Sequence, residues 1–132
     1  MSKPSGHHGT PSRSKETITV FFDPDAQKPI RAQPDKLVVK HNHVAEITWQ
    51  RGGASSESWR FTYIGFTKPV GTGCDIKVPQ VSSDGSQVTT EDYNRNGGDW
   101  DLEFNYLIFI QDSRGRVYSS DPSVINRRDV PG

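Results

Sequence analysis

Short stretches in which apolar and polar residues alternate recur along most of this chain, and they constrain its fold more than any other feature. Residues 16–23, for example, carry Ile18, Val20 and Phe22 at every second position. Alternation of period two is typical of a strand with one face on the core, and no long segment shows the 3.6-residue period of an amphipathic helix. Further candidate strands cover 36–41, 44–50, 58–66, 74–82, 86–93, 99–112 and 116–121.

Clusters of Gly, Asn, Asp, Ser and Pro separate these segments, as at 51–57 and 94–98, and such clusters mark turns. Seven or eight short strands at intervals of about 8–15 residues predict an all-β fold, an antiparallel β-sandwich of Ig-like type. Pro79 indicates an edge strand, because proline has no N–H to give to a sheet. The single cysteine, Cys74, rules out an internal disulfide and so an antibody-type domain with a cysteine pair.

The chain of 132 residues is long enough for one domain. Residues 1–15 are rich in Ser, Gly, Pro and basic side chains, with no bulky apolar residue after Met1, and we predict a disordered arm. Residues 16–132 are then expected to form one sandwich domain. The segment 122–132 follows an Asp-Pro junction near its end.

Charge and hydropathy narrow the class of function. The chain has 16 basic and 16 acidic residues and a formal net charge of zero, which argues against binding of nucleic acid or a membrane surface by bulk electrostatics. Its first residues lack the apolar core of a signal peptide, and no apolar run approaches the ~20 residues that span a bilayer. We therefore expect a cytoplasmic protein. The sequence predicts no cofactor and names neither a partner nor an oligomeric state.

His41 and His43 raise the possibility of a copper site in a sandwich fold. A blue-copper centre needs two histidines and a cysteine with a weak axial ligand. No histidine follows Cys74, and all four histidines precede residue 44. No metal site is predicted.

The bond between Asp121 and Pro122 is the strongest candidate for chemistry. A strand is expected to end there, because proline cannot donate to a sheet. The side-chain carboxyl of Asp121 can also reach its own carbonyl carbon, close a five-membered anhydride and expel the proline nitrogen. Groups held in such alignment reach effective molarities of ~10⁵–10⁸ M. Asp before Pro is equally compatible with plain extended backbone, and Asp23-Pro24 provides an internal comparison.

The turn before the last predicted strand sets the surroundings of this bond. Residues 112–115 suit a type I turn that ends in a left-handed glycine. Such a turn pairs Asp112 with Arg116 and, further along the two strands, Asp121 with Leu107.

Side chains two positions apart share a face of a strand, and this decides the expected neighbours of Asp121. On its face we expect Ser119, Leu107, Asn105 and Glu103, with Tyr118 and Ser120 pointing the other way. A second carboxyl nearby would raise the pKa of one member of the pair, and Glu103 and Asp101 are the candidates.

The segment "YSSDPSVIN" at 118–126, together with "FTYIGF" at 61–66 and a long polar loop, resembles the DP-EP family of small bacterial β-sandwich proteins. The resemblance covers roughly residues 16 to 128. It implies self-cleavage of the Asp-Pro bond, with Asp121 as nucleophile and Pro122 as leaving residue, and leaves the biological role unknown. No lysine follows Lys77, so a cross-link to Asp121 would need a lysine from another strand, namely Lys40, Lys68 or Lys77. Hydrolysis is therefore favoured over an isopeptide bond.

A non-catalytic binding module is the alternative hypothesis. Trp49, Trp59 and Trp100, with four tyrosines, could line a face for a carbohydrate or a protein partner, although most such rings in a small sandwich belong to the core. Trp100 is the best exposed candidate. Two or more coplanar exposed rings would favour this function, and burial of Trp49 and Trp59 would count against it.

Overall fold

The computed structural model describes residues 12–40, 43–53, 58–66, 75–94, 102–120 and 123–127. These residues form ten strands, and none of them belongs to a helix long and apolar enough to cross a membrane. The strands are β1 (Ser12–Phe22), β2 (Ile30–Gln33), β3 (Lys36–Lys40), β4 (His43–Arg51), β5 (Trp59–Phe66), β6 (Gln80–Val81), β7 (Gln87–Asn94), β8 (Leu102–Asp112), β9 (Val117–Ser120) and β10 (Ser123–Arg127).

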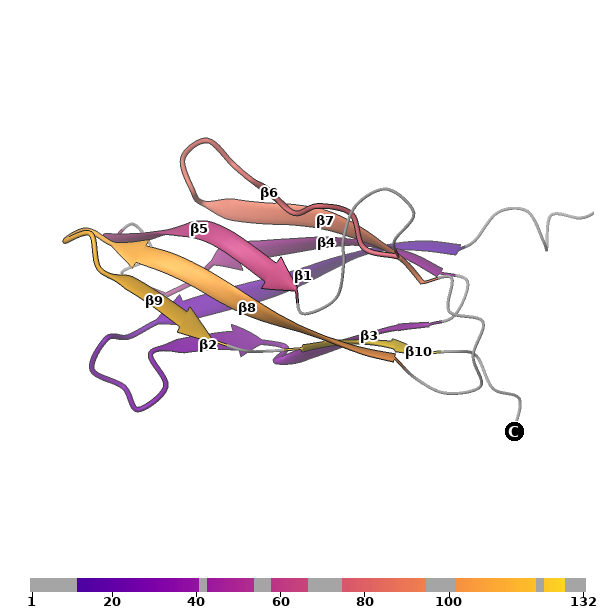
Figure 1. The fold of residues 1–132 in the computed structure, drawn as a ribbon, viewed down its shortest axis with the longest axis horizontal. Coiled ribbons are helices and arrows are strands. Elements are labelled where there is room, and N and C mark those ends of the chain that lie inside the picture. Colours follow the sequence, from indigo (N-terminus) through magenta and orange to yellow (C-terminus); the bar gives the residue numbers. More distant parts are fainter. Residues whose placement is uncertain are drawn as a thin grey trace, which may run out of the picture.

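The strands form two layers (Figure 1). Sheet A has the order β2-β1-β4-β7-β6, and sheet B has the order β3-β10-β8-β5, with β9 paired to β8 as well. The predicted all-β sandwich is confirmed. Pro79 directly precedes β6, which is an edge strand as expected.

Both sheets are mixed, whereas the sequence analysis predicted purely antiparallel pairing. β1 runs parallel to β4, and β3 runs parallel to β10. The alternation of apolar residues reports which face of a strand is buried, but it is the same for either direction of a neighbour. The alternation therefore cannot predict that two distant segments pair in parallel.

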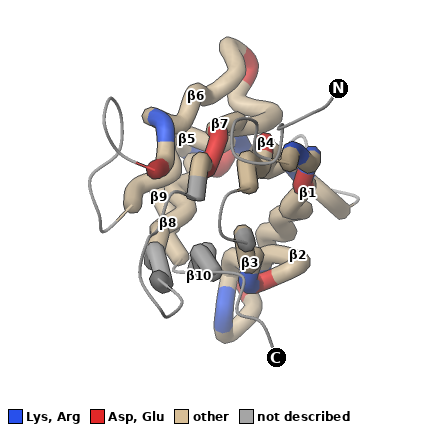
Figure 2. The backbone as a smooth tube through the Cα atoms, turned by 90° about the vertical axis from the view of Figure 1, so that its right-hand side faces the viewer, with Lys and Arg blue, Asp and Glu red and all other residues tan. Residues whose placement is uncertain are grey.

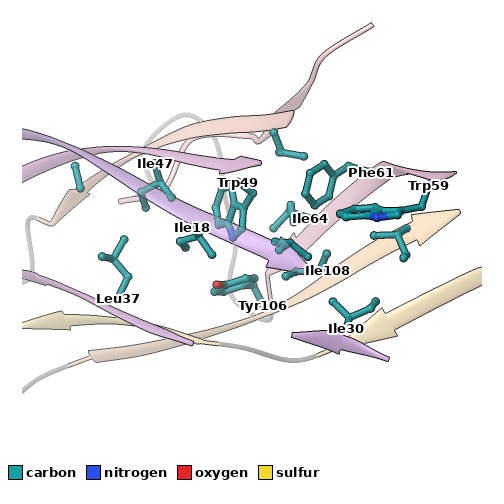
Figure 3. Close-up of a cluster of buried hydrophobic side chains, with 14 of the residues drawn as sticks. Ile18, Ile30, Leu37, Ile47, Trp49, Trp59, Phe61, Ile64, Tyr106 and Ile108 are labelled. Carbon is teal, nitrogen blue, oxygen red and sulfur yellow. The ribbon is translucent and has the colours of Figure 1, made fainter. Parts of the chain in front are cut away.

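The inward residues of the two sheets form one continuous core. Its largest fully buried side chains are Trp49, Tyr106 and Phe61, and Figure 3 shows how they meet between the layers. Trp59 is also buried, at 3% exposure, and its ring packs edge-on against Phe61 with 5.1 Å between centroids. Each such side chain contributes about 1.5–3 kcal/mol through loss of contact with water. The alternation predicted these positions because strand geometry sends every second side chain inward.

Strand β1 begins at Ser12, four residues before its predicted start and inside the expected arm of residues 1–15. Ser12 and Ser14 hydrogen-bond through their hydroxyls to the two ring nitrogens of His43, at 2.6 and 2.8 Å. Parallel pairing with β4 thus extends the strand over polar residues that have no apolar alternation. Residues 1–11 lie outside the described residues.

The chain crosses from sheet A to sheet B between β2 and β3. Only Pro34 and Asp35 separate the two strands, and the peptide bond between Gln33 and Pro34 is cis. The sequence analysis assigned no strand at β2, since four residues next to proline-rich turns show too little alternation. This corner brings the start of β3 beside the final strands of the chain.

Candidate functional site

The strands on either side of the Asp-Pro junction at 121–122 keep one register along β8. β9 places Ser120 opposite Ile108, and β10 places Ser123 opposite Asn105. Two residues separate the paired positions on each strand, so the pairing does not shift across the junction. The two junction residues themselves lie outside the described residues.

The turn at 112–115 fixes this register, as the sequence predicted. The N–H of Asp112 donates to the carbonyl of Arg116 at 2.9 Å, and Gly115 has a φ of 84°. The Asp112 carboxylate accepts from the N–H groups of Arg114 and Arg116, at 2.9 Å each, and from the Arg116 guanidinium at 3.1 Å. Partial removal from water would raise the pKa of Asp112, but these hydrogen bonds outweigh it and hold the pKa below its ordinary value.

The sheet continues beyond the Asp-Pro junction, which corrects the expectation that the last strand ends there. β10 pairs with β8 on one side and with β3 on the other, so it is an interior strand of sheet B. Proline interrupts a ladder locally because it has no N–H to donate, but this interruption does not end the sheet. The second neighbour of β10 is β3. This strand lies too far away in sequence for the pairing to be predicted from local residues.

The predicted faces of β8 and β9 are confirmed for their described residues. Ser119 is exposed and Leu107 is 36% exposed, so both lie on the outer face of sheet B. Tyr118 points the other way, packs against the core and meets the Phe22 ring edge-on at 4.8 Å. Asp121 itself is not described, and its place on the outer face stays a prediction.

The carboxyls and the tryptophan proposed from sequence are not brought to the junction by any described contact. Glu103 lies opposite Ile125 on β10, and its side chain is not described. It is four positions from Leu107 along β8, which corresponds to about 13 Å in an extended strand. Asp101 and Trp100 lie outside the described residues. The pairing pattern thus gives Glu103 no direct place beside residue 121.

Asp35 is the carboxyl that the sequence analysis missed. It directly precedes Lys36, the β3 residue that pairs with Ser123 at the start of β10. It also lines a cavity of about 740 Å³ together with Ser119 and Ser120, the last two described residues before the junction. No local signal marks Asp35, because only the parallel pairing of β3 with β10 brings it to this place.

Tyr106 lies on the core-facing side of β8, opposite Phe66 of β5. Its side chain is fully buried, with its ring 5.4 Å from that of Trp49 (Figure 3). Burial raises the pKa of the Tyr106 hydroxyl to about 12, the nearby indole of Trp49 lowers it, and the charge of Asp35 adds to the rise. Neither the hydroxyl nor Nε1 of Trp49 has a hydrogen-bond partner of good geometry among the described residues. Tyr106 therefore remains protonated at neutral pH.

The surroundings of the second Asp-Pro bond are different. Asp23 follows the end of β1, and its Oδ1 accepts from the N–H of Asp25 at 3.0 Å, while its N–H donates to the carbonyl of Pro29 at 2.8 Å. These two hydrogen bonds form a turn at the end of β1. Asp23-Pro24 thus lies in the loop of the β1–β2 hairpin, whereas the strands on either side of 121–122 both pair with one neighbour, β8.

The family model of the DP-EP family matches residues 10–128, which is most of the chain. The chain belongs to the DP-EP family. This confirms the resemblance drawn from the segment 118–126 and extends it to residues of β1 that precede the predicted domain.

Among solved structures, the crystal structure of the cysteine protease inhibitor EhICP2 from Entamoeba histolytica is similar to this chain. The sequence identity is 8% and the TM-score is 0.39, with 87% of this chain and 97% of that chain covered. A likeness at this level is no basis for an inference about function. No curated protein matches the sequence.

Proposed function

We propose that this DP-EP protein cleaves its own Asp121-Pro122 bond. An oxygen of the Asp121 carboxylate bonds to the carbonyl carbon of the same residue, the bond from that carbon to the Pro122 nitrogen breaks, and the nitrogen takes up a proton. Water then opens the five-membered anhydride and leaves two carboxyl groups on residue 121. The substrate is the chain itself, and the proposal involves no cofactor.

The unbroken register of β9 and β10 along β8 is the observation that supports this function most. Both strands are held by backbone hydrogen bonds to the same neighbour, so the two ends of the junction have a fixed separation. A reacting bond between fixed ends loses little conformational entropy on reaching its transition state. At Asp23-Pro24, by contrast, the Asp23 carboxylate accepts from the Asp25 N–H in a hairpin loop.

Asp35 is the second carboxyl in this proposal, in preference to Glu103. It adjoins the residue that pairs with Ser123, and it lines the same cavity as Ser120. A carboxyl in this position can give a proton to a departing nitrogen, a form of catalysis that contributes typically ~10²–10⁴-fold.

Hydrolysis remains favoured over a lysine cross-link. The ammonium group of Lys77 bonds the Glu91 carboxylate at 2.8 Å and lies 4.9 Å from the Tyr93 ring centre, so it is engaged on sheet A. The side chain of Lys40 is not described, and Lys68 lies outside the described residues. Of the three lysines considered from sequence, the one whose side chain is described is held away from β9.

Intact-mass spectrometry of the purified protein under denaturing conditions tests the proposal. We expect two fragments that meet at Asp121-Pro122, and no cut at Asp23-Pro24, over days at mildly acidic to neutral pH. Asp121→Asn should abolish cleavage, because an amide forms no anhydride. Pro122→Ala should slow it by giving a poorer leaving group. Equal cutting at both Asp-Pro bonds, or a chain that stays intact, would overturn the function.

Two variants test whether Asp35 or Glu103 is the second carboxyl. Asp35→Asn should slow cleavage by about 10²-fold or more and change its dependence on pH. Glu103→Gln is the matched control, because it removes a carboxyl from the same sheet, and should change the rate less than about threefold. A larger effect of Glu103→Gln would return that role to Glu103.

One observation counts against the alternative function as a binding module, and one supports it. Trp49 and Trp59 are buried, which counts against it. On the outer face of sheet B, however, Tyr63 is 51% exposed and its ring lies 6.0 Å from that of Phe109, tilted by 38°. Protein fluorescence in a titration with neutral oligosaccharides, repeated with Tyr63→Ala, tests it. A saturable signal lost in that variant would favour a carbohydrate ligand.

A further inference from the structure

A second cluster of reactive side chains lies at the end of the sandwich where β1 and β4 begin, the end that faces the viewer in Figure 2. The hydroxyl oxygen of Ser12 lies 2.6 Å from Nδ1 of His43, and the hydroxyl oxygen of Ser14 lies 2.8 Å from Nε2 of the same ring. Both ring nitrogens are therefore hydrogen-bonded to serine hydroxyls. None of these three residues takes part in the proposed self-cleavage.

The parallel pairing of β1 with β4 creates this arrangement. Ser12 lies directly opposite His43, and Ser14 follows two residues further along β1. Residues that are paired across a sheet, and residues two apart on one strand, point to the same face. The same register pairs Ile18 with Trp49, and both of these side chains are fully buried. The cluster therefore lies on the core-facing side of sheet A, where that face changes from apolar to polar residues.

The two hydrogen bonds of the His43 ring differ in direction. A neutral imidazole carries one N–H donor and one nitrogen that only accepts. One serine hydroxyl therefore accepts a hydrogen bond from the ring, while the other donates its own proton to the ring. A hydroxyl that donates to an imidazole, with a third group orienting that ring, is the arrangement of a serine nucleophile and its general base. All three parts are present on two adjacent strands.

Exposure and distance indicate which serine is the nucleophile. Ser12 is exposed, whereas Ser14 and His43 are half-buried. A nucleophile must be accessible to its reaction partner, and the contact of Ser12 with Nδ1 is also the shorter of the two. Ser14 then accepts from the N–H at Nε2, which leaves the lone pair of Nδ1 directed at the Ser12 hydroxyl.

We propose that Ser12 is an acyl-acceptor site for activated carboxylic esters, with His43 as its general base and Ser14 as the residue that positions the ring. The Ser12 oxygen bonds to the carbonyl carbon of the ester, and the bond from that carbon to the leaving oxygen breaks. The proton passes from Ser12 through Nδ1 of His43 to the leaving oxygen, so that the products are an ester on Ser12 and a free alcohol. General base catalysis of this kind contributes typically ~10²–10⁴-fold.

Labelling with an alkyl fluorophosphonate tests the proposal, because this probe phosphonylates activated serines with loss of fluoride. The full-length protein and its Asp121→Asn variant are labelled in parallel, so that self-cleavage cannot disturb the result, and peptide mass spectrometry locates the adduct. We expect an adduct on Ser12 in both proteins. Ser12→Ala should remove it, and His43→Gln should slow its formation by about 10²-fold or more. No adduct on Ser12, or an unchanged rate in the His43→Gln variant, would overturn the proposal.

Two substitutions of Ser14 separate orientation of the ring from folding. Ser14→Ala removes the hydroxyl that holds Nε2 and should slow labelling of Ser12 by about tenfold, whereas Ser14→Thr keeps a hydroxyl and should label within about threefold of the native rate. Ser119→Ala is the control, because Ser119 is exposed on a strand without a histidine, and it should leave labelling unchanged. Thermal unfolding shows whether each variant is folded. Equal rates for Ser14→Ala and Ser14→Thr would overturn the role given to Ser14.

Discussion

At the scale of single residues, burial of Tyr106 makes the stability of the folded protein depend on pH in the alkaline range. Its pKa is raised from 10.0 to about 12, first of all by burial. A raised pKa in the folded state means that its contribution to stability is complete below about pH 10 and is lost as pH rises toward 12. Tyr106→Phe should therefore retain roughly 2–3 kcal/mol more stability than the native chain above pH 12, measured relative to pH 8.

Urea unfolding at a series of alkaline pH values measures this difference. Tyr63→Phe is the control, because it removes a tyrosine hydroxyl from a half-exposed position of the same protein. Comparison between variants cancels the deprotonation of lysines, which all of them share. Identical alkaline profiles for Tyr106→Phe and the native chain would show that the hydroxyl is not buried as described.

The pKa of Asp84 is lowered rather than raised, so Asp84 affects stability at acidic pH. The Ser86 N–H and hydroxyl and the Ser82 hydroxyl donate to its Oδ1, and these bonds lower the pKa of Asp84 from 3.8 to about 2. Its contribution to stability is present above about pH 4 and disappears as pH falls toward 2. We expect Asp84→Ala to unfold at lower urea concentration than the native chain at pH 7, and at the same concentration near pH 2. A gap that persists at pH 2 would contradict this, and Asp25→Ala is the exposed-turn control.

At the scale of elements, the position of β10 gives a sharp test of topology. β10 is paired on both sides, whereas β6 is an edge strand paired only with β7. Proline removes an N–H donor, which costs a ladder hydrogen bond in an interior strand and much less at an edge. Ile125→Pro should lower the free energy of unfolding by about 3 kcal/mol or more, and Gln80→Pro by about 1 kcal/mol. Thermal and urea unfolding measure both, and equal losses would place β10 at an edge.

Local pattern predicted the elements whose causes are local. The alternation of β1, β5 and β8 and the turn at 112–115 were readable, because side-chain period and turn chemistry act over a few residues. β2, β10 and the polar start of β1 were not, since each depends on a neighbour far away in sequence. The same limit applies to the candidate site. Asp121-Pro122 can be recognised in the sequence as a dipeptide. Asp35 cannot, because only the parallel pairing of β3 with β10 brings it near the start of β10.

At the scale of the whole molecule, cleavage at residue 121 should not release the segment that follows. β10 lies after the junction and is paired with both β3 and β8. The two fragments should therefore elute together from a sizing column under native conditions and separate in denaturant. In an Ile125→Pro variant whose Asp121-Pro122 bond is still cleaved, the small fragment should be held less tightly. Release of the small fragment from the native protein in ordinary buffer would contradict the interior position of β10.

The interior position of β10 also has a consequence for synthesis. Lys36 and Ser123 are paired neighbours in the sheet, yet most of the chain is translated between them. While residues 123–127 are still inside the ribosome, β3 lacks the strand that joins it to β8, and Leu37 and Val39 cannot complete the buried core to which they belong. Contacts between distant segments form slowly, and exposed strand edges invite aggregation. Until β10 has emerged, the nascent chain should therefore expose an unpaired edge of β3 and an incomplete core.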